Sequence, residues 1–263
     1  MNRGNRIFLA CIYWAFVLYV FVPLILMVLM GFKDSKFIGF PLKSWTLDWY
    51  LGVFENAEVL STFGYSVAIA VASTLISVAV GTWIAVLLEG RKFMGRTAMF
   101  GMTVLPALIP GIISAIAFRI YARGLGIEPG MGAIIWSHAV HNVPFVVLVV
   151  MARLSTLPKS QLDAARDLGA DPFVTFLRIT VPYLIPAILG ASVFCLLLSF
   201  DDFVRSFFLG GYEPTLPVLI FAKLRSGMSP EINAIATVAL ILTALVGIWA
   251  ERFTRRMNKE TDA

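Results

Sequence analysis

The stretch VLSTFGYSVAIAVASTLISVAVGTWIAVLL, from Val59 to Leu88, contains 30 residues and no Asp, Glu, Lys or Arg. An α-helix rises about 1.5 Å per residue, so about 20 apolar residues cross a hydrocarbon core of about 30 Å. The stretch is longer than this minimum. It therefore predicts a helix that crosses a membrane.

Five other stretches of 19 to 26 residues also lack charged side chains. Over the whole chain, 59% of the residues are hydrophobic and 14% are charged, whereas about 25% are charged in soluble domains. This composition excludes an ordinary water-soluble enzyme. The strand-like alternation of a membrane β-barrel is also missing, which leaves helices as the spanning structure. We expect an all-α polytopic protein with transmembrane helices at about 7–32, 62–88, 97–121, 131–152, 180–200 and 232–250. Pro106, Pro110 and Gly111 would break or kink the third of these unless neighbouring helices or water satisfy the freed backbone groups.

The charges outside these segments predict the orientation. The first apolar run is too long for the 7–15-residue core of a signal peptide, so we expect it to remain as a span. With six spans, the termini and the second and fourth loops share one side, which holds 13 basic and 7 acidic residues. The positive-inside rule makes this side cytoplasmic. We expect a cytoplasmic N-terminus at 1–6, a transmembrane domain at 7–250 and a cytoplasmic tail at 251–263, disordered from 255. The net charge of +5 then reflects topology, with no reason to expect nucleic-acid binding.

One cytoplasmic loop has the pattern of a folded structure. It reads SQLDAARDLGADPFVTFLRITVPYLIP, from Ser160 to Pro186. Ser160 is placed to cap a helix, and Gly169 stands where a left-handed residue would end it. Asp171 and Pro172 have the pattern that begins a second helix. We expect Leu162, Ala165 and Leu168 to share one face of the first helix.

This loop resembles the EAA loop of type I ABC importer permeases, which has the pattern Glu-Ala-Ala, three residues, then Gly. Asp163 stands in place of the glutamate and keeps its charge. The resemblance implies a permease of the MetI-like fold, with a coupling helix at about 160–171 that docks on a cytoplasmic ATPase subunit. An amphipathic helix resting on lipid headgroups is the alternative. The implied coupling residues are Leu162, Asp163, Ala164, Ala165, Leu168, Gly169 and Ala170.

Three further motifs are similar to the second permease subunit of spermidine/putrescine-type importers. They are LSFDDFV at 198–204, TLPVLIF at 215–221 and SPEINAIAT at 229–237. The resemblance implies ATP-driven import of a small amine-containing solute through the bacterial cytoplasmic (inner) membrane. It also implies a second homologous permease subunit, a periplasmic or extracellular substrate-binding protein, and two ATPase subunits. The chain has no P-loop, so we expect no cofactor in it, and ATP and Mg on the ATPase partners.

Charged residues near the spans are candidates for the solute pathway, because ionisable groups are costly in a membrane. Asp201 and Asp202 end the fifth span and could bind a cationic amine. Alternatively, they form a helix-end pair that is solvated or bonded to Arg205.

Two positions depart from the polyamine-permease pattern. Gly111 stands where an acid is usual, and Arg205 stands where an apolar residue is usual. A fixed cation disfavours a bare diamine but suits an amine that also carries a carboxylate, such as an opine or an amino acid derivative.

His138 and His141 lie three residues apart in the fourth span. A metal site would need a third ligand, which the sequence does not supply, so we expect no metal and a packed or pore-lining pair. A transporter driven by an ion gradient remains the competing class. It would need an ion or proton site near the midplane, yet the six runs hold no Asp or Glu.

Overall fold

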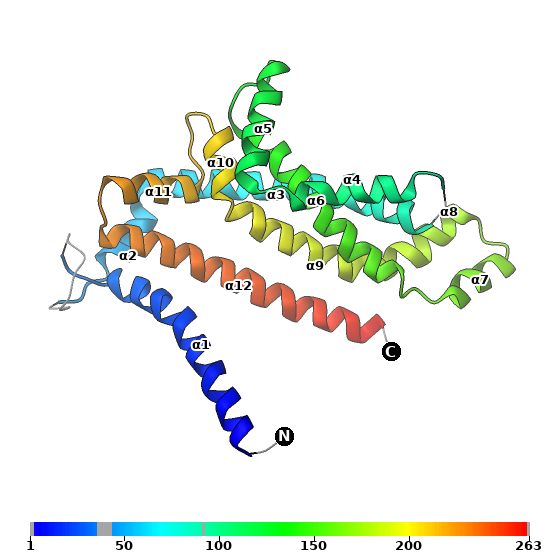
Figure 1. Cartoon of the computed structure of the whole chain (residues 1–263), viewed down its shortest axis with the longest axis horizontal. Helices are drawn as coiled ribbons and strands as arrows, with labels where there is room; N and C mark the ends of the chain where they lie inside the picture. The colour runs from blue at the N-terminus through cyan, green and yellow to red at the C-terminus, as the bar shows by residue number, and fades with distance from the viewer. Residues whose placement is uncertain (1–2, 36–43, 91–92, 262–263) are drawn as a thin grey trace. The chain divides into compact units, whose positions relative to one another are not determined.

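The computed structural model describes the backbone of residues 3–35, 44–90 and 93–261 (Figure 1). Within these ranges the regular structure is helical, as expected for an all-α protein. The chain forms two compact units, one from residues up to Ser61 with Leu219–Leu242, the other from Thr62–Val218 with the residues from Thr243 onward. The helices are α1 Arg3–Met30, α2 Asp48–Glu55, α3 Ala57–Gly90, α4 Arg96–Leu108, α5 Gly111–Gly124, α6 Met131–Leu154, α7 Lys159–Asp167, α8 Pro172–Thr175, the π-helix η1 Phe176–Thr180, α9 Val181–Phe200, α10 Phe203–Leu209, α11 Leu216–Ser226 and α12 Pro230–Thr261.

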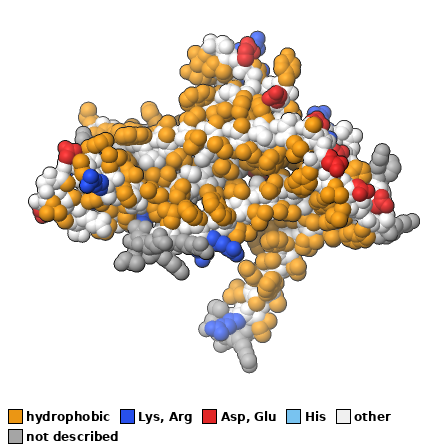
Figure 2. All heavy atoms as spheres, turned by 180° about the vertical axis from the view of Figure 1, so that it is seen from behind, with side chains coloured by type: hydrophobic (Ala, Val, Ile, Leu, Met, Phe, Trp, Pro, Cys, Tyr) orange, Lys and Arg blue, Asp and Glu red, His pale blue; other side chains and the backbone are white. Residues whose placement is uncertain are grey.

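Among the described residues, five helices are long and apolar enough to cross a membrane. They lie at Gly4–Met30, Ala57–Gly90, Met131–Leu154, Pro172–Phe200 and Pro230–Arg255. On the face shown in Figure 2, hydrophobic side chains cover most of the surface and charged side chains gather in small groups. Such a surface is suited to contact with lipid or other apolar helices rather than with water.

The third expected span, 97–121, is a broken pair and not one straight helix. Helices α4 and α5 meet at an angle of 107°, and the described residues contain up to six candidate spans if this pair counts as one. Ile109 at the break is extended, with φ −78° and ψ 129°. Pro110 causes this conformation, because proline disfavours helical backbone in the residue before it.

In the first unit, α2 packs against the end of α1. The Tyr50 hydroxyl donates to the Val28 carbonyl at 2.9 Å, and the Trp49 indole donates to the Lys33 carbonyl at 2.9 Å. Lys223 lies 3.0 Å from Glu231 and 3.8 Å from Glu58. Aromatic hydrogen bonds therefore hold α2 against the end of α1, and ion pairs join α11 to α12 and to the start of α3.

In the second unit, α3, α6 and α9 enclose the main apolar core. The core consists of Ala85, Leu88, Val146, Val147, Val150, Leu184, Ala191 and Cys195. Gly81 lets α3 and α6 approach closely, since a Cβ at this position would lie 2.7 Å from Cβ of Val146. A second core joins α3, α6 and α10 through Ile69, Ala133, Ile134 and Leu209.

The loop after α6 folds as two short helices, with differences from the expected caps. Helix α7 begins at Lys159, one residue before Ser160, and no side chain caps it. The prediction of a Ser160 cap is therefore wrong, because Pro158 already occupies the capping position with its fixed φ. Asp171 does cap α8, as its carboxylate accepts the Phe173 N–H at 2.7 Å.

A π-helix joins α8 to α9. The N–H of Val181, the residue after η1, bonds to the carbonyl of Phe176, five residues earlier. Pro182 follows directly, and its ring would clash with the carbonyl four residues back in an ordinary α-helix. The wider π turn relieves that clash at the point where the loop enters the membrane segment.

The C-terminal segment also differs from its expected form. Helix α12 continues to Thr261, whereas the sequence predicts disorder from 255. Arg, Met, Lys and Glu in this segment are strong helix formers, and they extend the last span beyond its apolar part.

Candidate functional site

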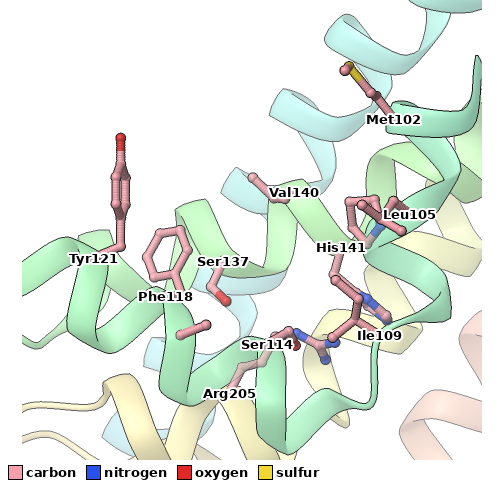
Figure 3. A pocket seen from close by; sticks show the side chains of 12 residues that line it. Met102, Leu105, Ile109, Ser114, Phe118, Tyr121, Ser137, Val140, His141 and Arg205 are labelled. Atoms are coloured by element: carbon pink, nitrogen blue, oxygen red, sulfur yellow. The ribbon is translucent and has the colours of Figure 1, made fainter. Parts of the chain in front are cut away.

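A cavity of about 340 Å³ lies beside the break between α4 and α5 (Figure 3). Its wall is mostly apolar, and its polar lining comes from Ser114, Ser137, His141 and Arg205. The apolar lining residues are Met102, Leu105, Pro106, Ile109, Ala117, Phe118, Tyr121 and Val140. The broken span, α6 and α10 together build this site.

Arg205 is the charged residue in the described wall of the cavity, and it is held in place by Asp202. Asp202 caps α10, and its Oδ1 accepts the backbone N–H of Arg205 at 2.7 Å. Its Oδ2 accepts from Nη1 of the same residue, which forms an ion pair. The two side chains are 6% and 13% exposed. A guanidinium this buried requires such a partner, because an isolated charge is costly in a membrane.

Gly111 lies next to Arg205 although 94 positions separate them in the sequence. A Cβ at Gly111 would lie 3.8 Å from Nη2 and 4.0 Å from Nη1 of Arg205. Gly111 and Arg205, which the sequence singles out separately, are thus neighbours in space. The sequence does not reveal this contact, because it depends on how α5 packs against α10.

The two histidines have different surroundings. His138 is fully buried, with Nδ1 bonded to Ser199 Oγ at 2.7 Å and Nε2 3.8 Å from Asp202 Oδ1. His141 is half-buried and lines the cavity. In Figure 3 the Arg205 side chain extends toward the part of the cavity where His141 and Ile109 lie. His138 is therefore a packed residue of the helix core, and His141 faces the cavity.

Asp201 and Asp202 also differ. Asp201 ends α9 and is exposed, whereas Asp202 is largely buried by its contacts with Arg205. Of the two sequence interpretations, pairing with Arg205 describes Asp202. The described residues contain no cluster of three or more His, Cys, Asp or Glu side chains that could hold a metal ion.

Three serines around His138, which the sequence does not single out, form a buried polar cluster behind the cavity wall. Ser199 bonds to His138 and also lies 2.9 Å from Ser73 of α3, and Ser206 of α10 lies 3.5 Å from His138 Nε2. Isolated hydroxyls in apolar runs carry little signal by themselves. The i, i+4 spacing of Ser73 and Ser77 places both hydroxyls on one face of α3, and this pattern could have indicated a polar contact there.

The loop at 159–171, which the sequence predicts to be the coupling loop, presents a distinct surface. Ala165 is buried, Leu162 is half-buried and Leu168 is 87% exposed. The prediction that these three share a face is wrong for Leu168, because α7 ends at Asp167 and the chain turns there. The turn depends on Gly169, whose φ is +75°. Asp163 is exposed and accepts a hydrogen bond from Arg166 at 3.3 Å. Ala164 is exposed, and Ala170 is half-buried.

The chain is similar to known transport proteins over nearly its whole length. Residues 77–262 match the family described as "Binding-protein-dependent transport system inner membrane component". The spermidine/putrescine transport system permease protein PotC of Escherichia coli K12 is 33% identical over 92% of this chain and 91% of its own length. The putrescine transport system permease protein PotI of the same strain is 31% identical over 92% of this chain and 89% of its own.

Solved structures agree with this fold. A bacterial ABC transporter involved in alginate import has a TM-score of 0.75 at 18% identity, covering 96% of this chain and 94% of the other. The MetNI methionine ABC transporter has a TM-score of 0.64 at 19% identity, covering 73% and 93%. The expected MetI-like fold is confirmed.

Proposed function

We propose that this chain helps to import a small amine-containing solute, because it belongs to the family of binding-protein-dependent transport system inner membrane components. As a member of this family, it is the permease subunit of an importer and not an enzyme. Sequence similarity to proteins named for amine transport supports this proposal. Those named for spermidine/putrescine or putrescine transport match more than nine-tenths of the chain. Nothing supports the alternative of a transporter driven by an ion gradient.

The energy for import is supplied by two ATPase subunits that bind the coupling loop. Leu168 supports this assignment, since an apolar side chain 87% exposed on a turned loop is suited to burial against a partner. Asp163 and Ala164 of α7 are also exposed, whereas Ala165 is buried. ATP binding shifts the permease only if the ATPase contacts the loop differently in its two states.

The same segment of chain connects this loop to the cavity. From α7 it passes through α8 and η1 into α9, and α9 ends at Asp201, beside the cap of α10. Movement of α7 is therefore transmitted along one helix to the residues that hold Arg205. The π-helix is the natural bending point, because π turns interrupt the regular α-helical bonding.

Further partners complete the pathway. A second, homologous permease chain supplies the other half, and a periplasmic or extracellular binding protein delivers the solute. Both termini face the cytoplasm in this arrangement. The exposed surface of helix α1 favours contact with another protein or with lipid. In its most apolar stretch, none of the residues is buried within the described chain.

Reconstitution tests this proposal. The permease is co-expressed with the second permease chain and the ATPase subunits, and the complex is purified. The complex is then placed in liposomes that contain ATP, with the binding protein outside. We expect an ATPase to co-purify and labelled amines to accumulate only when ATP and binding protein are both present. Uptake driven by an ion gradient in the purified chain alone, or no uptake of any amine, would overturn the proposal.

A further inference from the structure

The cavity beside the broken span offers hydrogen-bond donors in apolar surroundings. Arg205 is the charged side chain in its described wall, and no carboxylate belongs to that wall. Donors in a region shielded from water bind an anion more strongly than the same donors on a surface. A cavity for a purely cationic solute would be expected to have acidic side chains instead.

Arg205 has donors to spare after it has paired with Asp202. A guanidinium carries five N–H groups, and Asp202 receives one from Nη1 and one from the backbone. Nη2 faces Gly111, where a Cβ would lie at 3.8 Å. The absence of a side chain at Gly111 leaves this edge of the guanidinium open.

Asp202 is already occupied as an acceptor. Its Oδ1 accepts the backbone N–H of Arg205 at 2.7 Å, and its Oδ2 is in the ion pair. An incoming ammonium group would have to compete with Arg205 for these oxygens and would be repelled by its charge. Asp201, which is exposed at the end of α9, remains as an acidic residue nearby in the chain.

His141 supplies a second polar atom to the same cavity. Its Nδ1 is buried and has no hydrogen-bond partner within the described part of the chain. A buried polar atom without a partner costs about 1–3 kcal/mol. The His141 ring also has a hydrogen bond to the Pro106 backbone, whose carbonyl takes one ring N–H. Nδ1 therefore donates to a ligand oxygen only when both ring nitrogens carry protons.

We propose that Arg205, Gly111 and His141 form a binding site for the carboxylate of the transported solute. The solute is then a zwitterion that carries both an amine and a carboxylate, such as an amino acid derivative or an opine. This inference rests on the proposed function, because it adds a carboxylate to the amine proposed there. Gly111 acts by keeping the guanidinium accessible.

Putrescine and ornithine are matched probes, because they differ by one carboxylate. Uptake of each is measured in the reconstituted importer with its binding protein, and binding of each to that protein is measured separately. We expect ornithine to be taken up at least about tenfold more efficiently, since charge-assisted hydrogen bonds give about ten- to hundredfold discrimination. Equal or preferred uptake of putrescine would overturn the inference and leave the proposed amine importer intact. Uptake of neither would overturn both.

Substitution of Gly111 tests the site within the permease itself. Gly111→Asp places a carboxylate beside Arg205, and we expect it to lower ornithine uptake about tenfold or more. Gly111→Asn has nearly the same shape without the charge, and Gly111→Ala adds only a Cβ at an ordinary contact distance. We expect Gly111→Asn to lower ornithine uptake less than Gly111→Asp does, because it covers the guanidinium without neutralising it, and Gly111→Ala to lower it least. If Asp and Asn at this position behave alike, the carboxylate site is wrong.

Discussion

His138 Nδ1 and Ser199 Oγ lie 2.7 Å apart, which ties the N-terminal third of α6 to the last turn of α9. Ser199 continues the contact to Ser73 of α3 at 2.9 Å. One buried chain of hydrogen bonds therefore joins the three helices of the main core. Asp202, 3.8 Å from His138, places the cap of α10 at the end of this chain.

Replacement of His138 should weaken this junction. We expect His138→Leu to lower the stability of the purified complex by about 1–3 kcal/mol, because buried polar partners lose a hydrogen bond. Thermal unfolding in detergent measures the change. Trp136→Leu is the control, since Trp136 is 55% exposed on the same helix and should be nearly neutral. Equal losses of stability in both variants would show that the hydrogen bond between His138 and Ser199 does not stabilise the complex.

Close packing of α3 on α6 gives a second prediction. A Cβ at Gly81 would lie 2.7 Å from Val146 Cβ and 3.2 Å from the Val143 carbonyl. We expect Gly81→Ala to destabilise the complex by about 1–3 kcal/mol through overpacking. Gly64→Ala in the same helix meets nothing within 4 Å and should be tolerated.

A compensating change sharpens this test. Val146→Ala combined with Gly81→Ala should cost less than the sum of the two single changes, since it removes the Val146 Cγ1 methyl group that lies 2.8 Å from the added Cβ. The midpoint of thermal unfolding is compared across the single and double variants. Purely additive losses would mean that the two positions do not meet in the folded complex.

The sequence predicts local features well where a residue dictates its own backbone. Pro110 marks the break in the third span, Gly169 the left-handed turn, and Asp171 the cap of α8. Each depends on steric limits or bonds within a few residues. Ser160 failed as a cap because the neighbouring Pro158 decided where α7 begins.

Contacts between distant segments could not be predicted in this way. Gly111 and Arg205 attract attention separately as unusual residues, but their contact requires the packing of α5 against α10. Ser73 and Ser199 belong to two apolar runs, and neither run indicates a partner. The exposure of Leu168 likewise depends on the turn that follows Asp167.

The turn at Gly169 gives a prediction about energy coupling. The Ala170 N–H bonds to the Ala165 carbonyl and the Gly169 N–H to the Arg166 carbonyl, both at 2.9 Å, which is the Schellman arrangement. A side chain at φ +75° costs about 1–2 kcal/mol, and more when it is β-branched. We expect Gly169→Val to raise the ATP hydrolysed per solute imported while the spans still insert.

Asparagine provides the matched control at this position, because it tolerates left-handed backbone better than other residues. Gly169→Asn should keep coupling close to normal, and Gly169→Ala should fall between the two. ATP hydrolysis and solute uptake are measured on the same liposomes. If all three variants couple equally well, the left-handed turn is not part of the coupling mechanism.

Leu168 should provide much of the binding energy for the ATPase. Burial of a leucine side chain is worth about 1.5–3 kcal/mol, so we expect Leu168→Asp to weaken ATPase binding by about 10- to 100-fold. Titration of purified ATPase against the permease in detergent measures this affinity. Met94→Asp is the control, because Met94 is also fully exposed but lies before α4 and outside the coupling loop. If Leu168 contacts the ATPase, its replacement by a charged residue must weaken assembly. Unchanged affinity in the Leu168 variant would instead favour the alternative in which this loop rests on lipid headgroups.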